Sequence, residues 1–479
     1  MVLRLFLCCL LFSVALSGQS SVQQVVDRFA GTQVLENALV AVDVRLVDDG
    51  RQLASHNARV ACIPASTQKL ITTAAAMDIL GSDYRFETRL IASGPIEDGI
   101  LRGNLYIVGG GDPTLGSSRM DGAAELEEVV ESWARAIRER GIRRITGAVI
   151  GDGSRYGSDG TGRGWPWADL GNYYGAGAYG LNLNENSYEL TFTQRPDEGS
   201  TPPVLRVEPA VPGLKFTNEL TSGPRGSGDQ AYIFGAPFNY HHFIRGSIPA
   251  GTGSFRIRGS LPDPALLAAQ MLNDRLEAVG IVVTGPPATH LTVGGYTVGE
   301  MLDEQLSPYL SEIVDRTNMN SVNLYAEGLL REMNKANGRP REELASTEVV
   351  MDWLESRGLD TRGVNLRDGS GLDPRNFFSP AFMTAFLVDQ AGQERWVESI
   401  PLAGRSGSMR NVLRGTVAEG RVRGKSGTVN AVRTYAGYVD RPDGRRLAYS
   451  VAVNNHDLRT SVVNRLIYDL MRDLCTAGL

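Results

Sequence analysis

The chain has 479 residues, of which 42% are hydrophobic and 21% charged, a balance that excludes disorder, collagen and coiled coil as descriptions of the whole. At about 150 residues per domain, this length is enough for roughly three domains. The net charge of −6 leaves no broad basic field for phosphates, so we expect no nucleic acid partner.

Residues 1–17 are typical of a secretory signal peptide. Arg4 supplies a positive charge, residues 5–16 are apolar, and Ala15 and Ser17 are small residues at the −3 and −1 positions of a cleavage site. A membrane anchor is the weaker alternative, because about a dozen apolar residues are too few to cross a bilayer. We therefore expect an exported protein, located in the periplasm or the cell-wall space, with no transmembrane segment in the mature chain.

The rest of the chain falls into three stretches. Residues 18–82 combine a short helix, a strand hairpin and an Ala-rich helix that is apolar nearly all round. Residues 83–262 alternate short strands with Gly/Pro turns around one amphipathic helix, whose apolar residues recur at helical spacing from Leu126 to Ile137. Residues 263–479 open with a helix start at Asp263-Pro264, continue through helices to three strands, and end in a helix.

Strands at both ends of the chain predict the architecture. We expect them to form one antiparallel sheet flanked by helices, in an α+β fold. Residues 83–262 would then be an insertion of one or two α+β modules.

The cysteines and histidines do not support metal chemistry. Cys8 and Cys9 belong to the signal peptide, which leaves Cys62 and Cys475, and the five histidines are scattered without a metal-binding spacing. We therefore expect no metal and no cofactor. An oxidising compartment would permit a disulfide, and we expect Cys62 and Cys475 to pair because their segments should lie near the same sheet.

Ser66 and Lys69 lie one turn apart at the start of the Ala-rich helix, so they share a face. A hydroxyl is a poor nucleophile until a base takes its proton, and a lysine in a desolvated site can be that base. The pattern alone is weak, because a surface Ser and Lys would look the same. However, only four of the 48 basic residues are lysines, and one of them lies in an apolar helix.

Lys425-Ser426-Gly427-Thr428 opens a predicted strand, where small side chains would let the backbone approach a ligand closely. A phosphate loop is excluded, because its first glycine would have to be residue 419, which is Glu419, and no helix follows. A turn with a solvated lysine remains the alternative for this motif taken alone.

Ser321-Val322-Asn323 lies at a helix junction, where a plain N-cap is the alternative interpretation of Ser321. The order of the three motifs decides between these interpretations. Ser-x-x-Lys early, Ser-x-Asn in the middle and Lys-Ser-Gly-Thr on a late strand form the motif set of penicillin-interacting serine acyl enzymes. Arginine could not replace either lysine, because its guanidinium stays protonated.

With these motifs, the chain resembles the class C low-molecular-mass penicillin-binding proteins, which are D-alanyl-D-alanine carboxypeptidases/endopeptidases, over essentially the whole mature chain. Further segments similar to that family are 103–115, 164–167, 368–372 and 436–439. The resemblance implies a penicillin-binding (β-lactamase-like) transpeptidase domain with a helical subdomain, formed by residues 18–82 and 263–479. The inserted residues 83–262 would lie over the active-site cleft.

The resemblance also implies the catalytic roles. Ser66 would attack the carbonyl between two terminal D-alanines while Lys69 takes its proton. Ser321 would relay a proton to the leaving amine, and Asn323 would hold the substrate amide. Lys425 would supply positive charge near the substrate carboxylate and help to keep Lys69 neutral by like-charge repulsion.

The implied substrate-binding residues lie on the late strand and in the insertion. Hydroxyls of Ser426 and Thr428 would bind the terminal carboxylate, and the backbone N–H groups of Ser66 and Thr428 would form the oxyanion hole. Asp169 would pair with the free ammonium of a diamino acid in the stem peptide, and Tyr174 would cover its methylene chain. The full set of substrate-binding candidates is Ser426, Gly427, Thr428, Asp169, Tyr174, Arg375 and Asn430.

Two departures from the family pattern stand out. Val322 occupies a position that is often Asp, and Asp373-Pro374 displaces Arg375 by one residue, so its substrate role depends on the local fold.

The sequence therefore favours a serine DD-peptidase that cleaves D-Ala-D-Ala termini and peptide cross-links of peptidoglycan through an acyl-enzyme on Ser66, and that β-lactam antibiotics inhibit covalently. A β-lactamase is one alternative, but the sequence has no convincing glutamate motif for deacylation. A catalytically silent cell-wall-binding protein is the other, and intact Ser66, Lys69 and Lys425 argue against it. The oligomeric state stays open.

Overall fold

The computed structural model describes residues 21–296 and 298–479, so the expected signal peptide lies outside the described residues. A five-stranded antiparallel sheet joins the two ends of the chain, in the order β19-β20-β21-β1-β2. The strands are β1 (Leu39–Leu46), β2 (Gln52–His56), β19 (Val422–Val429), β20 (Val432–Asp440) and β21 (Arg446–Asn454). The expected α+β fold with one antiparallel sheet flanked by helices is confirmed.

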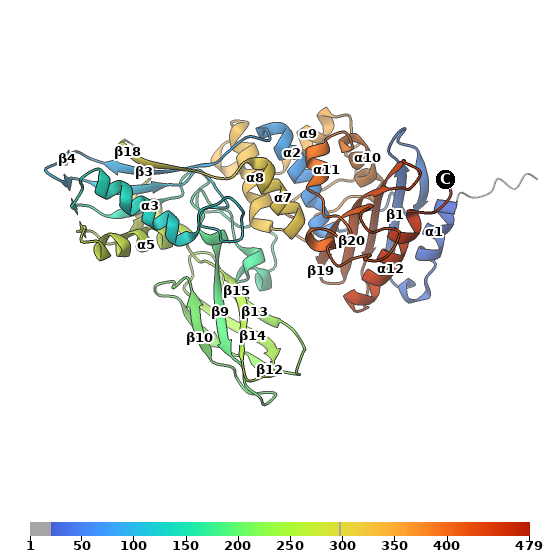
Figure 1. Ribbon diagram of the computed structural model, residues 1–479, viewed down its shortest axis with the longest axis horizontal. Coiled ribbons are helices and arrows are strands. Elements are labelled where there is room, and N and C mark those ends of the chain that lie inside the picture. Colours follow the sequence, from blue (N-terminus) through green and yellow to red (C-terminus); the bar gives the residue numbers. More distant parts are fainter. Residues whose placement is uncertain (1–20, 297) are drawn as a thin grey trace, which may run out of the picture.

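Helices cover both faces of this sheet (Figure 1). The apolar sides of α1 (Ser21–Ala30) and α12 (Thr460–Leu474) share one core with the alternate residues Val40, Val42 and Val44 of β1. The opposite face is covered by α10 (Pro380–Gln390), whose Phe386 packs in a second core with Tyr438 and Ala448.

The expected disulfide is wrong, because Cys62 and Cys475 are both free and buried. Cys62 packs against Ala41, whereas Cys475 lies in the core that contains Val40 and Val42. Because neighbouring residues of a strand point to opposite faces, the sheet separates the two thiols.

A helical part stands beside the sheet and holds Ser66 and Lys69. At its centre the short turn η2 (Ala65–Gln68) leads into α2 (Lys69–Leu80), whose residues 69–76 are all buried. The surrounding helices are α7 (Leu310–Asn320), α8 (Asn323–Ala336), α9 (Glu348–Ser356) and α11 (Glu394–Glu398). Three further short turns are η1 (Gln33–Leu35), η5 (Arg341–Glu343) and η6 (Gly407–Met409).

The insertion forms two lobes that extend away from the sheet (Figure 1). The first contains the sheet β17-β8-β6-β3-β18 and the smaller sheet β16-β7-β5-β4, packed against α3 and α5. Its elements are β3 (Glu87–Ser93), β4 (Ile96–Glu97), β5 (Ile100–Leu101), β6 (Asn104–Val108), α3 (Leu126–Glu139), β7 (Arg144–Ile145), β8 (Val149–Asp152), α5 (Pro264–Ala278), β16 (Val282–Val283), β17 (Ala288–Thr289), α6 (His290–Val293) and β18 (Glu300–Leu306).

The second lobe is built from two small sheets, β10-β9-β15 and β11-β14-β12 with β13 beside β14. Its strands are β9 (Ser187–Thr193), β10 (Val204–Glu208), β11 (Lys215–Asn218), β12 (Thr221–Gly223), β13 (Gln230–Phe234), β14 (His241–Pro249) and β15 (Ser254–Ser260). Between the lobes the chain forms α4 (Trp167–Leu170), η3 (Tyr173–Gly175) and η4 (Asn184–Asn186).

The insertion ends later in the chain than the sequence predicts. Asp263 does start a helix, since its Oδ1 accepts a hydrogen bond from the Leu266 N–H at 2.9 Å. However, α5 packs in the core of the insertion, and β18 pairs with β3. Residues 264–306 therefore belong structurally with the insertion, and the boundary after residue 262 differs from the one observed. A helix start identifies an element but does not tell which core that element joins.

Within the described chain, every helix is too short or too polar to cross a membrane. No three His, Cys, Asp or Glu side chains in this part of the chain gather closely enough to hold a metal ion.

Candidate active site

Ser66 and Lys69 meet at the start of α2. Ser66 lies half-buried in η2, and Lys69, with no exposed surface, begins the helix. A hydrogen bond of 2.9 Å joins Lys69 Nζ and Ser66 Oγ, and Lys69 Nζ also donates to the backbone oxygen of Ser370 at 2.6 Å. The spacing therefore places a nitrogen base in direct contact with a hydroxyl.

Burial lowers the pKa of Lys69. Removing the ammonium from water disfavours its charged form and lowers the pKa of Lys69 from 10.5 to about 7, although the nearby carboxylates of Asp368 and Glu327 oppose the shift. The neutral amine is then well populated at neutral pH, and it can accept the hydroxyl proton of Ser66.

The two acidic residues hold the loop that orients Lys69. Asp368 accepts hydrogen bonds from the backbone N–H groups of Gly371 and Asp373, each at 2.7 Å, and Glu327 accepts one from Ser370 at 2.8 Å. Burial raises the pKa of Glu327 to about 7 and also raises the pKa of Asp368. Sequence reasoning assigned these two carboxylates no role, although segment 368–372 was part of the family likeness.

Lys425 and Ser321 form a second lysine–hydroxyl pair. Lys425 Nζ donates to Ser321 Oγ at 2.8 Å. Burial, and after it the positive charges of Lys69 and Arg433, lower the pKa of Lys425 well below its usual range. Ser321 is not an N-cap, because it ends α7 in the left-handed conformation and Val322 precedes α8. For Lys69, burial rather than repulsion from Lys425 is the main cause of the lowered pKa.

Strand β19 passes directly beside the Ser66 turn. A Cβ atom at Gly427 would lie 2.6 Å from the backbone oxygen of Pro64 and 3.0 Å from the backbone nitrogen of Ser66, so only glycine permits this approach. The third motif thus brings its backbone next to Ser66.

The insertion reaches the site through Tyr174. The side-chain amide of Asn323 donates to the backbone oxygen of Tyr174 at 2.8 Å, and the Tyr174 hydroxyl donates to Asp169 Oδ1 at 3.1 Å. Burial raises the pKa of Asp169 above its usual value, while the Tyr174 hydroxyl counteracts the shift. Tyr174, and through it Asp169, is therefore linked to Asn323 of the second motif.

Arg433, which sequence reasoning missed, lies behind Thr428 on the neighbouring strand β20. Its buried guanidinium donates to the Thr428 hydroxyl and to the backbone oxygen of Gly427, as well as to Tyr435 and Asn464. These acceptors are all neutral, and no carboxylate pairs with Arg433 in residues 21–296 and 298–479. The only sequence signal was its position, five residues after Thr428 on a predicted strand.

A cleft of about 1000 Å³ collects most of the predicted site residues. Ser66, Ser321, Asn323, Asp169, Tyr174, Thr428 and Asn430 line it. Lys69 and Lys425 lie behind its wall, while Ser426 and Gly427 belong to the adjoining strand. The loop that follows β21 also contributes, through residues 456–458, as does residue 460 at the start of α12. Sequence reasoning did not single out these residues.

Arg375 is not brought into this cleft. Its guanidinium forms two hydrogen bonds with Asp373, of 2.9 and 2.6 Å, and the side chain is 58% exposed. Asp373, part of the departure from the family pattern, thus provides the partner that holds Arg375 away from the cleft.

Comparisons with known proteins find relatives over nearly the whole chain. The model of a family described as the D-Ala-D-Ala carboxypeptidase 3 (S13) family matches residues 22–471. A D-alanyl-D-alanine carboxypeptidase of Actinomadura sp. (strain R39) is 30% identical over 448 residues, covering 90% of this chain and 80% of that protein.

Solved structures show the same fold. Penicillin binding protein 4 from Haemophilus influenzae superimposes with a TM-score of 0.80 at 23% identity, over 95% of this chain and 98% of that one. A structure of the same protein in complex with a β-lactam gives a TM-score of 0.74 at 21% identity, with the same coverage of both chains.

Proposed function

The chain belongs to the D-Ala-D-Ala carboxypeptidase 3 (S13) family of serine-type peptidases, and from this membership we propose that it cleaves D-Ala-D-Ala termini of peptidoglycan stem peptides through an acyl-enzyme on Ser66. The observation that carries the proposal is the contact of 2.9 Å between Ser66 Oγ and a buried Lys69 whose pKa is about 7. Burial of an amine costs stability, and a lysine whose pKa is lowered by burial, in contact with a hydroxyl at a cleft, is typical of a functional site, which supports this role.

In the first step, Ser66 Oγ attacks the carbonyl carbon between the two D-alanines while Lys69 Nζ takes the hydroxyl proton. We assign the stabilisation of the negative charge that develops on the carbonyl oxygen to the backbone N–H groups of Ser66 and Thr428. The close approach of β19 to Ser66 at Gly427 supports this assignment. The C–N bond then breaks and leaves an ester on Ser66.

The leaving amine needs a proton when that bond breaks. Ser321 Oγ, hydrogen-bonded to Lys425 Nζ at 2.8 Å, is placed to pass a proton to the amine. Water then attacks the ester, Ser66 is regenerated, and the shortened peptide leaves with a new carboxylate. This route needs no metal or cofactor.

Substrate recognition follows from charge. Arg433 donates to the hydroxyl of Thr428, and Lys425, when protonated, adds positive charge beside the backbone oxygen of Ser426. This charge favours a substrate that ends in a carboxylate. Asp169, which also lines the cleft, supplies a carboxylate for the ammonium of a diamino acid. We assign Asn323 to the substrate amide between these two ends.

The same site would act on peptide cross-links and react with β-lactams. A cleft of about 1000 Å³ has room for a second peptide strand, as endopeptidase cleavage requires. A β-lactam presents a strained amide next to a carboxylate and would acylate Ser66 in the same way. Such a substrate places the protein in the periplasm or the cell-wall space, in agreement with the proposed export signal.

One assay tests the proposal. Purified protein should release D-alanine from a peptide ending in D-Ala-D-Ala and should turn over benzylpenicillin far more slowly. Rapid hydrolysis of benzylpenicillin with an intact peptide would indicate a β-lactamase. Inactivity towards both compounds would indicate a protein that only binds the cell wall.

A further inference from the structure

A smaller cavity, of about 290 Å³, adjoins the active-site cleft. Tyr173, Tyr174, Ser321 and Asn323 line both spaces, so the two are continuous around the second catalytic motif. The remaining wall of the smaller cavity is strongly basic.

Three arginines from different parts of the chain converge there: Arg119 from the first lobe, Arg258 from β15 and Arg316 from α7. We call this space the arginine cavity. Its charged lining also includes Glu185, whose Oε1 already accepts hydrogen bonds from the hydroxyls of Ser117 at 2.8 Å and Tyr325 at 2.9 Å.

The positive charge is not balanced. Arg119 lies 3.6 Å from Glu185, but neither Arg258 nor Arg316 has an ion-pair partner within residues 21–296 and 298–479. Burial, and after it the charge of Arg119, lower the pKa of Arg258. Arg258 is held over the ring of Tyr173, with its guanidinium carbon 3.7 Å from the ring centre.

Two guanidinium nitrogens also lack hydrogen-bond partners. Arg119 Nη1 and Arg316 Nε are buried, and nothing in the described part of the chain accepts their protons. Buried donors are nearly always satisfied, and leaving one unsatisfied costs free energy. An anion in this cavity would balance the excess positive charge of the three arginines.

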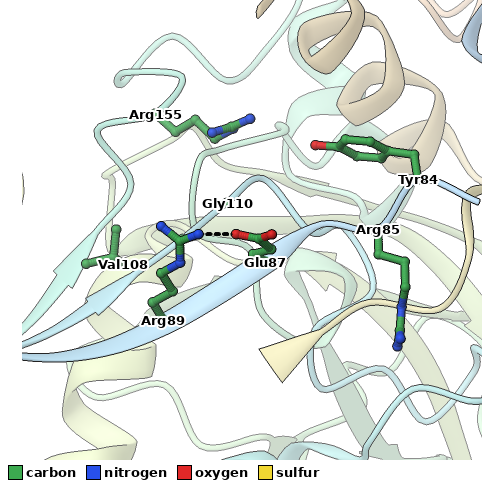
Figure 2. Close-up of a pocket in the computed structure, with 8 residues that line it drawn as sticks. Tyr84, Arg85, Glu87, Arg89, Val108, Gly110 and Arg155 are labelled. Atoms are coloured by element: carbon green, nitrogen blue, oxygen red, sulfur yellow. Dashed lines mark hydrogen bonds and ion pairs between the residues drawn. The ribbon is translucent and has the colours of Figure 1, made fainter. Parts of the chain in front are cut away.

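In a second basic cavity of the same molecule, the arginines have ion-pair or hydrogen-bond partners within the chain. The space of about 300 Å³ in Figure 2 is lined by Arg85, Arg89 and Arg155. Arg89 pairs there with Glu87, Arg155 pairs with Glu332 at 2.5 Å, and Arg85 donates to the backbone oxygen of Ser307 at 2.5 Å. The three guanidinium groups of that cavity thus have partners within the described residues, unlike Arg119 Nη1 and Arg316 Nε in the arginine cavity.

We propose that the arginine cavity binds a carboxylate that the substrate carries on the acyl side of the scissile bond. We assign the acyl side because Asn323 and Tyr174 line the cavity, and we assign these two residues to the acyl-side amide and side chain. Planar, partly desolvated guanidinium groups match the two oxygens of a carboxylate. The inference rests on the proposed function and adds an acidic subsite to it.

The test compares two peptides ending in D-Ala-D-Ala, one with a carboxylate at the end of the preceding side chain and one with the corresponding carboxamide. The wild-type protein should prefer the carboxylate in kcat/KM by about tenfold or more, as expected for a hydrogen bond to a charged group. Arg316→Gln should remove this preference without changing kcat/KM for the carboxamide peptide or the rate of acylation by benzylpenicillin. Arg316→Lys should keep part of it.

Arg28→Gln is the matched control, because it removes the same charge from a side chain that is 70% exposed on α1. Equal kcat/KM of the wild-type protein for the two peptides would overturn the inference, whether or not any variant folds. Inorganic phosphate that raises the melting temperature of the wild type but not of Arg316→Gln, without a preference between peptides, would show a site for free anions and would also overturn it. Hydrolysis of neither peptide would instead refute the proposed function.

Discussion

Lowering the pH from 7 to 5 should slow the acylation of Ser66 by benzylpenicillin about fiftyfold. With a pKa of about 7, roughly half of the Lys69 side chains are neutral at pH 7 and about 1% at pH 5. Because the neutral form is the base, activity is lost as the pH falls through about 7 and is retained above it. A lysine with an ordinary pKa would be neutral in only about 0.03% of molecules at pH 7.

Lys69→Arg tests the same reasoning by substitution. Its guanidinium stays protonated, so the variant should lose the contribution of a general base, about 10²–10⁴-fold in acylation rate, nearly as much as Lys69→Ala. Lys215→Arg, at an exposed position on β11, is the control and should change nothing. The rate of penicillin adduct formation, followed by stopped flow from pH 5 to 9, gives both results. Either of two results would refute Lys69 as the base. One is an acylation rate that does not change between pH 5 and 7. The other is a Lys69→Arg variant that keeps more than about a tenth of the wild-type rate, which is a rise in the activation free energy below roughly 1.4 kcal/mol.

Three further predictions address recognition and redox state. Asp169→Ala should lower kcat/KM for peptides with a free side-chain ammonium but not acylation by benzylpenicillin; equal losses on both would show a structural role. Arg433→Gln should raise KM about tenfold for peptides ending in D-Ala-D-Ala through the lost support of the terminal carboxylate, and Arg433→Lys should restore part of the affinity; an unchanged KM in steady-state assays would exclude this role. Thiol titration of the protein without residues 1–17, in denaturant and without reductant, should find Cys62 and Cys475 both free. The thiols of the native protein should react slowly at pH 8, because burial raises the pKa of both to about 11. Fewer than two free thiols in denaturant would show that the disulfide forms.

Local signals predicted most of the fold. The apolar spacing from Leu126 to Ile137 predicted helix α3, and Asp263-Pro264 predicted the start of helix α5. Strand patterns at the two chain ends led to the central sheet, because several short strands can bury their apolar faces only together. These features depend on residues that are close in sequence, or on a pattern that any packed sheet would require.

The features that sequence reasoning missed depend on long-range packing. Glu327 and Asp368 look like ordinary charged residues in the sequence, and only the fold shows that both are buried beside Lys69. Arg433 reaches Thr428 only because β20 pairs with β19 in this register. The three motifs could be found because each is a short run of residues and the three follow one another in a fixed order. The groups that shift the pKa values of their lysines are distributed through the chain.

The central claim is that Ser66 carries the acyl group. Intact-protein mass spectrometry after incubation with benzylpenicillin tests it most directly, on the wild type and on Ser66→Ala, which removes a single oxygen and should leave thermal unfolding unchanged. The wild type should gain the mass of one benzylpenicillin per chain and Ser66→Ala none. An adduct on folded Ser66→Ala, or no adduct on the wild type, would contradict the account.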